Sequence, residues 1–355
     1  MSEYVKKTLS ELFAQLEAEK KESYDIVVPT EALKVGYDVG TKTIFMSVPQ
    51  LGDKPNKLHG LTNFAHEQIA TKTGIPIRYY ERMRTEGKNV LLADNVNTWL
   101  PDREKRLIRV TGDNVRAILS DRYRIMDNHD VAFCVLEELK KIKDSADGLR
   151  IDIKECSLTD RHMYMKITSP DLSGKVLHYK GKQEPVEAGI IISNSEVGCG
   201  AFRVEPFMNV LVCSNGMIGE HRLAKVHLGK ERGIGLVDWS DATLELQDKE
   251  LWSSVRDLIR VTFSKEMFNL WLDTINEVAG REIAKPTEAI DNLIKKYSLP
   301  QNMKEDLVNQ FMKEGSPTVW GLSMAVTQVA QKQDNYEKQI EMERIGAELL
   351  TVVAE

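Results

Sequence analysis

Arginines gather in the segment RVTGDNVRAILSDRYRIMDNHD, which covers residues 109–130 and contains one tyrosine. A guanidinium group pairs with a phosphate through two parallel hydrogen bonds, and an aromatic ring can stack on an unpaired base. Each such stack contributes about 1–3 kcal/mol to binding. The pattern therefore indicates a nucleic-acid-binding site, whose candidate residues are Arg106, Arg109, Arg116, Arg122, Tyr123 and Arg124.

Acidic side chains are interleaved with these arginines and support a second interpretation. They could neutralise the guanidinium groups as ordinary surface ion pairs. For any one arginine this interpretation is favoured, and for the cluster as a whole both interpretations remain open. The acidic residues concerned are Asp102, Glu104, Asp113, Asp121, Asp127 and Asp130.

Small polar residues stand at the ends of two apolar stretches, in ISNSEVGCGAFRVEPF and VCSNGMIG. Asn-Gly is a turn signal because both residues tolerate positive φ. Two tight turns explain most of this pattern. The alternative is that both turns lie at the same edge of a sheet and present Asn194, Ser195 and Asn215 to a ligand. Trp99, in LLADNVNTWL, is expected in the core rather than on a stacking surface.

Motifs that would indicate an enzyme are incomplete. No Gly-Lys pair is followed by Ser or Thr, which excludes a Walker-type phosphate loop. His66 and Glu67 could begin a zinc-binding helix, but Ala70 stands where the second histidine is needed. We interpret His66 as a surface or packing residue. We therefore predict no catalytic residue, no metal ligand and no cofactor, and favour a protein that is not an enzyme.

The charge of the chain is uneven. Of the 355 residues, 42% are hydrophobic and 29% are charged, and the net charge is -6. Residues 101–235 have an excess of 2 positive charges, whereas residues 236–355 have an excess of 8 negative charges. A protein that coats duplex DNA indiscriminately usually has a broadly basic surface. Any positive surface of this chain must therefore be local.

The compartment can be inferred from features that the sequence lacks. The 4 cysteines form no Cys-x-x-Cys pair, which is typical of free thiols in a reducing compartment. No apolar run is long enough to span a membrane, and the charged N-terminus has no apolar signal-peptide core. We expect a cytoplasmic protein that does not enter a membrane.

Short strands are expected to hold the arginines. RLIRV and VRAILS flank the turn at residues 111–114 and predict a β-hairpin. DVAFCVLEELKKIK is typical of an amphipathic helix. Four further strands are expected in LRIDIKEC, HMYMKIT, VEAGIIISN and AFRVEPFMNVLVC. We expect the hairpin and these strands to form one antiparallel sheet with a crossing helix, in an α+β fold.

N-terminal helices are expected before the hairpin. A capping box at Thr8–Glu11 begins a helix that runs to about Lys21. Residues 61–87 predict two helices broken at Gly74-Ile75-Pro76. The chain then divides into an N-terminal α/β segment at residues 1–102 and an antiparallel sheet core at residues 103–235.

The acidic region at residues 236–355 is expected to be helical. Three helices are predicted there, and the last runs from about Pro317 to Leu350. One side of this last helix would carry a long apolar stripe, formed by Leu322, Val326, Val329, Tyr336 and Ile340. Such a stripe would pack on the body of the protein or on a partner chain, so we expect a homo-oligomer.

Several stretches together resemble a known family. These are HEQIATKTGIPIRYYERM, LLADNVNTWL, VRAILSDRYRIMDNHDV, ISNSEVGCGAF and VCSNGMI, in this order. They resemble the phage- and plasmid-borne domain-of-unknown-function family 932, over roughly residues 60–230. The resemblance implies a mobile element in the cytoplasm of a bacterial cell. It implies no reaction, and no catalytic residue can be transferred.

Two classes of function suit a mobile element. The first is a nucleic-acid-binding protein that binds or anneals single-stranded DNA in recombination or replication. Phage recombinases of the Erf and RecT kinds also combine an antiparallel sheet with a crossing helix, which is an analogy of fold alone. The alternative is a protein-binding inhibitor of a host defence system, whose acidic C-terminal helices would bind a host protein. An enzyme that acts on nucleic acid ranks third.

Overall fold

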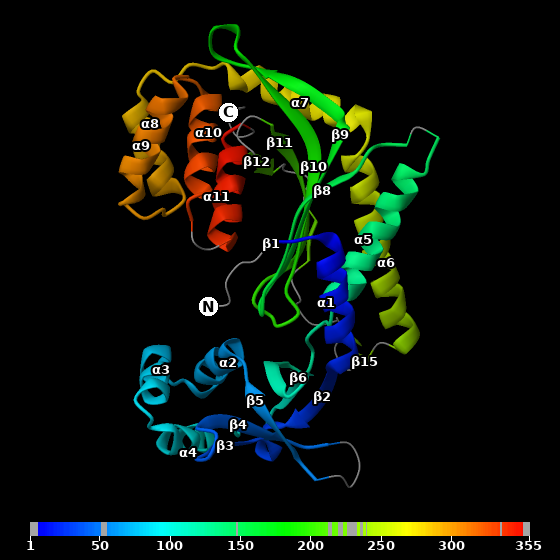
Figure 1. Ribbon diagram of the computed structural model, residues 1–355, viewed down its shortest axis with the longest axis vertical. Helices are drawn as coiled ribbons and strands as arrows, with labels where there is room; N and C mark the ends of the chain where they lie inside the picture. The colour runs from blue at the N-terminus through cyan, green and yellow to red at the C-terminus, as the bar shows by residue number, and fades with distance from the viewer. Residues whose placement is uncertain are drawn as a thin grey trace.

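The protein consists of two lobes, each built around its own β-sheet (Figure 1). The computed structural model describes residues 6–50, 55–146, 148–211, 215–218, 223–225, 233–234, 237–238, 240–333 and 336–350. The lower lobe in Figure 1 holds residues 23–120, and the upper lobe holds the larger sheet, the first helix and the C-terminal helices. Helices combined with mainly antiparallel strands confirm the predicted α+β class, including the helical C-terminal region.

The lower lobe contains a six-stranded sheet. Its strands are β2 (Ser23–Pro29), β3 (Lys34–Asp38), β4 (Thr43–Val48), β5 (Lys57–Leu61), β6 (Lys105–Thr111) and β7 (Asn114–Ser120). They lie in the order β2-β6-β7-β5-β4-β3, and all neighbours are antiparallel except β5 and β7. β6 and β7 form the predicted hairpin. Gly112 in its turn has φ 56°, which glycine adopts without a steric cost.

Three short helices pack with this sheet around one hydrophobic core. They are α2 (Asn63–Thr73), α3 (Ile77–Thr85) and α4 (Asn89–Trp99). The hydroxyl of Thr62 accepts a hydrogen bond from the N–H of Ala65 at 3.2 Å and caps the start of α2. Gly74, with φ 70°, ends it in the left-handed conformation. The predicted helix break at residues 74–76 is therefore confirmed.

The upper lobe contains a seven-stranded sheet. Its strands are β1 (Lys6–Lys7), β8 (Asp152–Leu158), β9 (Met163–Leu177), β10 (Gln183–Asn194), β11 (Phe202–Val210), β12 (Asn215–Ile218) and β13 (Leu223–Lys225). The order is β1-β8-β9-β10-β11-β12, β13 also pairs with β11, and every pair is antiparallel. A separate two-stranded pair consists of β14 (Gly233–Ile234) and β15 (Val237–Asp238).

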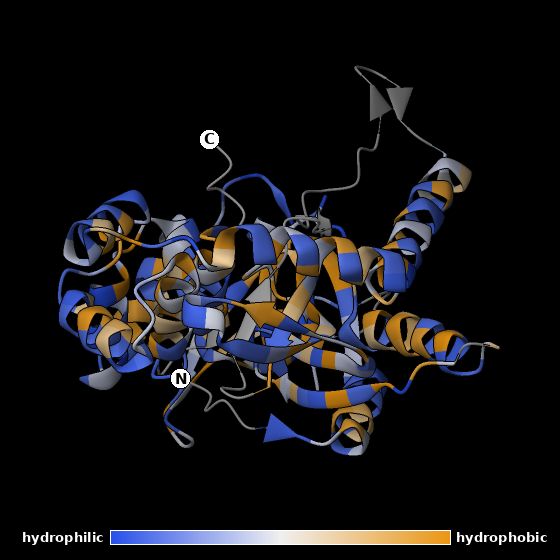
Figure 2. Ribbon diagram, turned by 90° about the horizontal axis from the view of Figure 1, so that it is seen from above, coloured by the Kyte–Doolittle hydropathy of each residue, from blue (hydrophilic) through white to orange (hydrophobic). Residues whose placement is uncertain are grey.

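The remaining helices belong to the upper lobe. They are α1 (Leu9–Glu22), α5 (Asn128–Lys143), α6 (Asp241–Thr262), α7 (Lys265–Ala279), α8 (Pro286–Lys296), α9 (Met303–Glu314), α10 (Val319–Ala330) and α11 (Tyr336–Glu348). α8 and α9 pack in a core that they share with α10 and α11 rather than on the sheet. α1, α5, α6 and α7 share the main core with Ile190 and Ile192 of β10. Ile191 lies on the opposite face, where it meets Ile340 of α11. Figure 2 shows hydrophobic and hydrophilic residues side by side along the helices around the sheet.

The expectation that the hairpin belongs to the same sheet as residues 152–210 is wrong. β6 pairs with β2, and β7 pairs with β5, all within the lower lobe. The strand pattern could not reveal this, because a hairpin presents two free edges and either sheet could use them. β2 and β5 bind these edges. Two arginines of the hairpin, Arg109 and Arg116, lie where the two lobes meet, whereas Arg106 pairs within the lower lobe.

The single long helix expected at residues 317–350 is wrong as well. α10 ends at Ala330, and α11 follows and packs against it. Leu322, Val326 and Val329 lie in one core with Met342 and Ile345 of α11. Folding back buries Leu322, Val326 and Val329 inside the chain, and the side chain of Tyr336 lies outside the described part of the structure. The stripe therefore no longer argues for a homo-oligomer.

Helices α6 and α7 are part of the upper lobe rather than a separate acidic module. Leu251, Val255, Ile259 and Phe268 belong to the same core as the sheet and α5. Trp99 departs from its predicted place in the core, because its side chain is 64% exposed at the C-terminal end of α4.

His66 joins α2 to α3 and is a packing residue, as expected. Its Nδ1 and the hydroxyl of Tyr80 are 2.8 Å apart, and both side chains are buried. Burial lowers the pKa of His66 from 6.5 to about 3, and Arg84 acts in the same direction. The imidazole is therefore neutral in the folded protein.

We predict that His66 makes the fold sensitive to acid. The unfolded chain binds a proton at this residue below pH 6.5, whereas the folded chain resists protonation down to about pH 3. Stability is thus lost as the pH falls through this window, by about 2 kcal/mol at pH 5. Urea unfolding of the wild type and His66→Gln at pH 7 and pH 5 measures this. The wild type should lose about 2 kcal/mol more than the variant, and equal losses would contradict the prediction.

Candidate nucleic-acid interface

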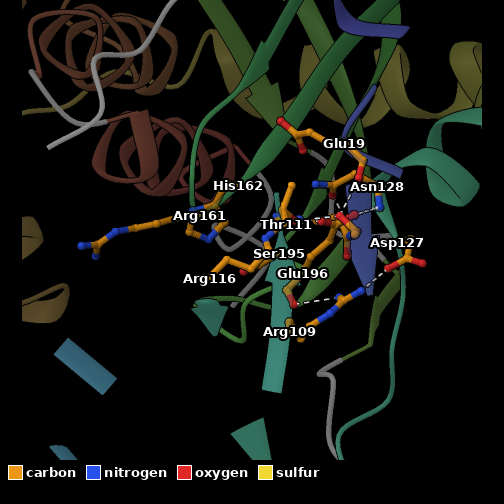
Figure 3. Close-up of polar contacts among 12 residues, drawn as sticks. Glu19, Arg109, Thr111, Arg116, Asp127, Asn128, Arg161, His162, Ser195 and Glu196 are labelled. Atoms are coloured by element: carbon orange, nitrogen blue, oxygen red, sulfur yellow. Dashed lines mark hydrogen bonds and ion pairs between the residues drawn. The ribbon is translucent and has the colours of Figure 1, made fainter. Parts of the chain in front are cut away.

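Arg109 lies at the junction of the two lobes and makes its hydrogen bonds inside the protein (Figure 3). Its guanidinium group donates to Asp25 at 3.0 Å, to Asp127 at 2.5 Å and to the backbone carbonyl of Glu196 at 3.0 Å. The side chain is only 5% exposed. Burial on its own would lower the pKa of Arg109, but Asp127 and Asp25 raise it above the ordinary value. The group is a permanent buried cation with carboxylates as partners.

Arg116 extends from β7 to the buried carboxylate of Glu196. Its Nη2 lies 2.7 Å from Oε2 of Glu196, and Oε1 accepts a hydrogen bond from the backbone N–H of Asn128. Burial raises the pKa of Glu196 above its ordinary value, although Arg116 and Arg109 act in the opposite direction. Glu196 therefore connects β7 of the lower lobe with α5 of the upper lobe.

Arg106 and Arg124 also pair with carboxylates. Arg106 contacts Asp102 and lies 2.7 Å from Glu104. Arg124 lies 2.6 Å from Asp248 of α6. Both side chains are 14% exposed. Their guanidinium groups are thus paired with carboxylates of the same chain.

The remaining two candidates differ in exposure. Arg122 is exposed, and among the described residues no carboxylate partner is found for it. Tyr123 donates a hydrogen bond from its hydroxyl to the backbone carbonyl of Ser195 at 2.9 Å, and burial raises its pKa. Of the six predicted residues, the structure brings Arg109, Arg116 and Tyr123 together around residues 195–196 and leaves Arg122 at the surface.

Asn194 and Asn215 lie at opposite ends of the sheet, so the alternative that both turns share one edge is wrong. β10 and β11 are antiparallel, with Ser193 opposite Arg203, and β11 then meets β12 at Val210 and Asn215. Successive antiparallel hairpins alternate between the two ends of a sheet. Asn215 begins β12, but its side chain lies outside the described part of the structure.

Asn194 and Ser195 are fully buried. The side-chain amide of Asn194 donates to the carbonyl of Met126 at 2.8 Å, and the hydroxyl of Ser195 accepts from the N–H of Cys199 at 3.0 Å. Their polar groups hold the loop after β10 against the start of α5. Neither side chain faces solvent.

A cavity of about 230 Å³ adjoins this junction. Its charged lining combines Lys20, Arg109 and Arg116 with four carboxylates, those of Glu19, Asp25, Asp127 and Glu196. The opposing charges leave no excess of positive charge for a phosphate. The arrangement therefore suits a lobe-to-lobe contact better than an anion-binding site.

Helix α3 carries an exposed basic surface that the sequence interpretation missed. We call it the α3 face and define it by Arg78, Tyr79 and Arg82. Tyr79 is 49% exposed, and the side chain of Arg82 is 70% exposed. The signal was present in IRYYERMR, where residues 78 and 82 share one side of a helix and Tyr80 and Met83 share the buried side.

Other site types are not found in the described residues. That part of the chain has no group of three His, Cys, Asp or Glu side chains placed to hold a metal ion. None of its helices is both long and apolar enough to cross a membrane. Cys213, one of the four cysteines, lies outside the described residues.

A family model for a domain of unknown function, DUF932, matches residues 116–347. The chain belongs to the DUF932 family. In this DUF932 protein the matched range ends at residue 347, whereas the resemblance was expected to end near residue 230. It begins at residue 116 rather than near residue 60, so α3 lies outside it. No curated protein and no solved structure matches the chain.

We predict that Arg109 stabilises the fold and that Arg122 does not. Arg109→Met leaves two carboxylates without their cation at the lobe junction, which should cost about 3–5 kcal/mol of unfolding free energy. Arg122→Ala changes an exposed side chain and should cost less than about 0.5 kcal/mol. Urea unfolding followed by circular dichroism measures both. A stable Arg109→Met variant would show that Arg109 is free for another role, including nucleic-acid binding.

Proposed function

We propose that this chain is a non-enzymatic nucleic-acid-binding protein of a bacterial mobile element, and that the α3 face is its contact surface. The observation that carries the proposal is the exposed helix side with Arg78, Tyr79 and Arg82. Guanidinium groups bind phosphate, and an exposed tyrosine offers a surface for stacking on a base. Binding or annealing of single-stranded DNA in recombination or replication is one form of this function.

The local charge supports this proposal. Residues 71–88 contain five Lys or Arg residues and two Glu residues, in a chain with a net charge of -6. A local basic surface attracts a polynucleotide even when the whole molecule is acidic. Of the basic residues of α3, Arg78 and Arg82 are exposed, whereas Arg84 is 25% exposed and pairs with Glu81.

The ion pair on the α3 face does not prevent binding. Arg82 and Glu86 are 2.8 Å apart, with side chains 70% and 52% exposed. Exposed pairs of this kind contribute only about 0–1 kcal/mol. A phosphate, which forms stronger charge-assisted hydrogen bonds, can replace Glu86 as the partner of Arg82.

The alternative function, a protein-binding inhibitor of a host defence system, is supported by a different surface. An apolar cavity of about 420 Å³ lies beside α8 and α9 and is lined in part by Ile290, Phe311 and Met312. Met312 is 74% exposed, and α9 begins with Glu305 and Asp306. An apolar groove with acidic neighbours suits a basic protein partner, such as an enzyme that binds DNA.

We predict that the chain binds labelled oligonucleotides and that the α3 face is required. Replacing both arginines, in Arg78→Ala with Arg82→Ala, should weaken binding about tenfold or more at low salt, because two phosphate contacts are lost. The slope of log affinity against log salt should fall by about 2. Fluorescence polarisation over a salt series measures both quantities.

Arg150→Ala is a matched control. Arg150 is 72% exposed and lies 2.8 Å from Asp171, so it resembles Arg82 in exposure and pairing but belongs to the upper lobe. The control should bind as the wild type does. If the wild type binds neither single-stranded nor duplex DNA at micromolar concentration and low salt, the proposal is wrong and a search for a host protein partner becomes the better experiment.

A further inference from the structure

Helices α2 and α3 are joined in the manner of a DNA-reading motif. The connection consists of Gly74, Ile75 and Pro76. Gly74 adopts φ 70° directly after the last residue of α2. The N–H of Ile75 donates to the carbonyl of Ala70 at 3.0 Å and closes the end of the helix. Pro76 then begins α3, and the N–H of Tyr80 donates to its carbonyl at 3.0 Å. A three-residue turn containing glycine between two packed helices is typical of a helix-turn-helix.

The buried residues of these helices follow the spacing that this motif needs. Ile69, Ala70, Tyr80 and Met83 are at most 3% exposed and lie in one core. The contact between His66 and the hydroxyl of Tyr80 fixes the rotation of α3 relative to α2.

The rest of the lobe presents α3 outward. α2 contacts β5 and β7, α4 contacts β3, and α3 packs against α2 and α4. Figure 1 shows α3 at the outer edge of the lower lobe. In a helix-turn-helix the first helix packs on the body of the protein and the second enters the major groove. The positions of α2 and α3 correspond to these two roles.

We propose that α2 and α3 form a helix-turn-helix that reads duplex DNA in the major groove. This inference rests on the proposed function and names its ligand as duplex DNA with a preferred sequence. A single helix fills the major groove, which is about 12 Å wide. On DNA without the preferred sequence Arg78 and Arg82 contact phosphates, whereas on the preferred sequence each can bind the O6 and N7 atoms of a guanine. Tyr79, between them in the sequence, can contact a base edge or a phosphate.

The α3 face suits a duplex better than a single strand. Proteins that bind single-stranded DNA hold its sugar-phosphate backbone in a basic groove and stack successive bases on several aromatic rings. The α3 face is a convex helix side with one tyrosine, Tyr79, and two arginines that are one turn apart. One turn of α-helix rises about 5.4 Å, so the two arginines can reach neighbouring base pairs.

The first experiment is selection from a library of random duplexes with the full chain, followed by affinity measurements on the selected sequence. We expect a preferred sequence that contains guanine. We also expect Arg78→Ala and Arg82→Ala each to reduce affinity for it by about tenfold or more, and each to relax the preference at a different base pair. Arg150→Ala should leave both properties unchanged.

The second experiment locates the contact in the groove. Methylation of guanine N7, which lies in the major groove, should block binding at the bases that depend on Arg78 and Arg82. Tyr79→Ala should change the preferred sequence if Tyr79 contacts a base edge, or lower the affinity for the selected duplex if it contacts a phosphate. Circular dichroism and thermal unfolding of each variant establish that the substitutions at exposed helix positions leave the fold intact.

The outcomes separate this inference from the proposed function. The protein could bind the library without enriching any sequence, and the Arg78→Ala/Arg82→Ala variant could lose affinity equally for single-stranded and duplex DNA. That result would overturn the helix-turn-helix but not the proposed nucleic-acid binding. A selected sequence that is insensitive to N7 methylation would also overturn it. Absence of binding to any DNA would overturn both.

Discussion

The buried guanidinium group of Arg109 imposes the main constraint on this structure. A cation that is 5% exposed requires carboxylates and carbonyls around it, and these come from β2, from the start of α5 and from the loop after β10. The partners belong to both lobes. The position of the lower sheet relative to the upper sheet therefore depends on how this one charge is satisfied, and Arg116 with Glu196 extends the same network.

This constraint also decides where positive charge remains available. Arginines that stabilise the lobe junction cannot also hold a phosphate backbone, because their donors point at carboxylates inside the protein. Among the exposed cations of the lower lobe are Arg78 and Arg82, which lie away from the junction on α3 and meet solvent. A chain with a net charge of -6 can thus have a basic surface in the lobe that lies outside the matched DUF932 range for most of its length.

Local elements were predictable from particular residues. The capping box at Thr8 and Glu11 forms as expected, with the hydroxyl of Thr8 accepting from the N–H of Glu11. Gly74 and Gly112 end or turn the chain where the sequence indicated. The burial of Trp99, the long last helix and the sheet of the hairpin were predicted wrongly. Each depends on which surface packs against which, and a period of two or of 3.6 residues does not contain this information.

The sequence by itself determined the elements: the helix caps and the turns follow from the preferences of nearby residues. Only the tertiary structure decided the partners of the charges. Asp25 and Glu196 are 84 and 87 residues away from Arg109 along the chain, and they became its partners because two sheets meet at that point. An interaction between charges depends on distance in space and on burial, and neither quantity is written in the order of the residues.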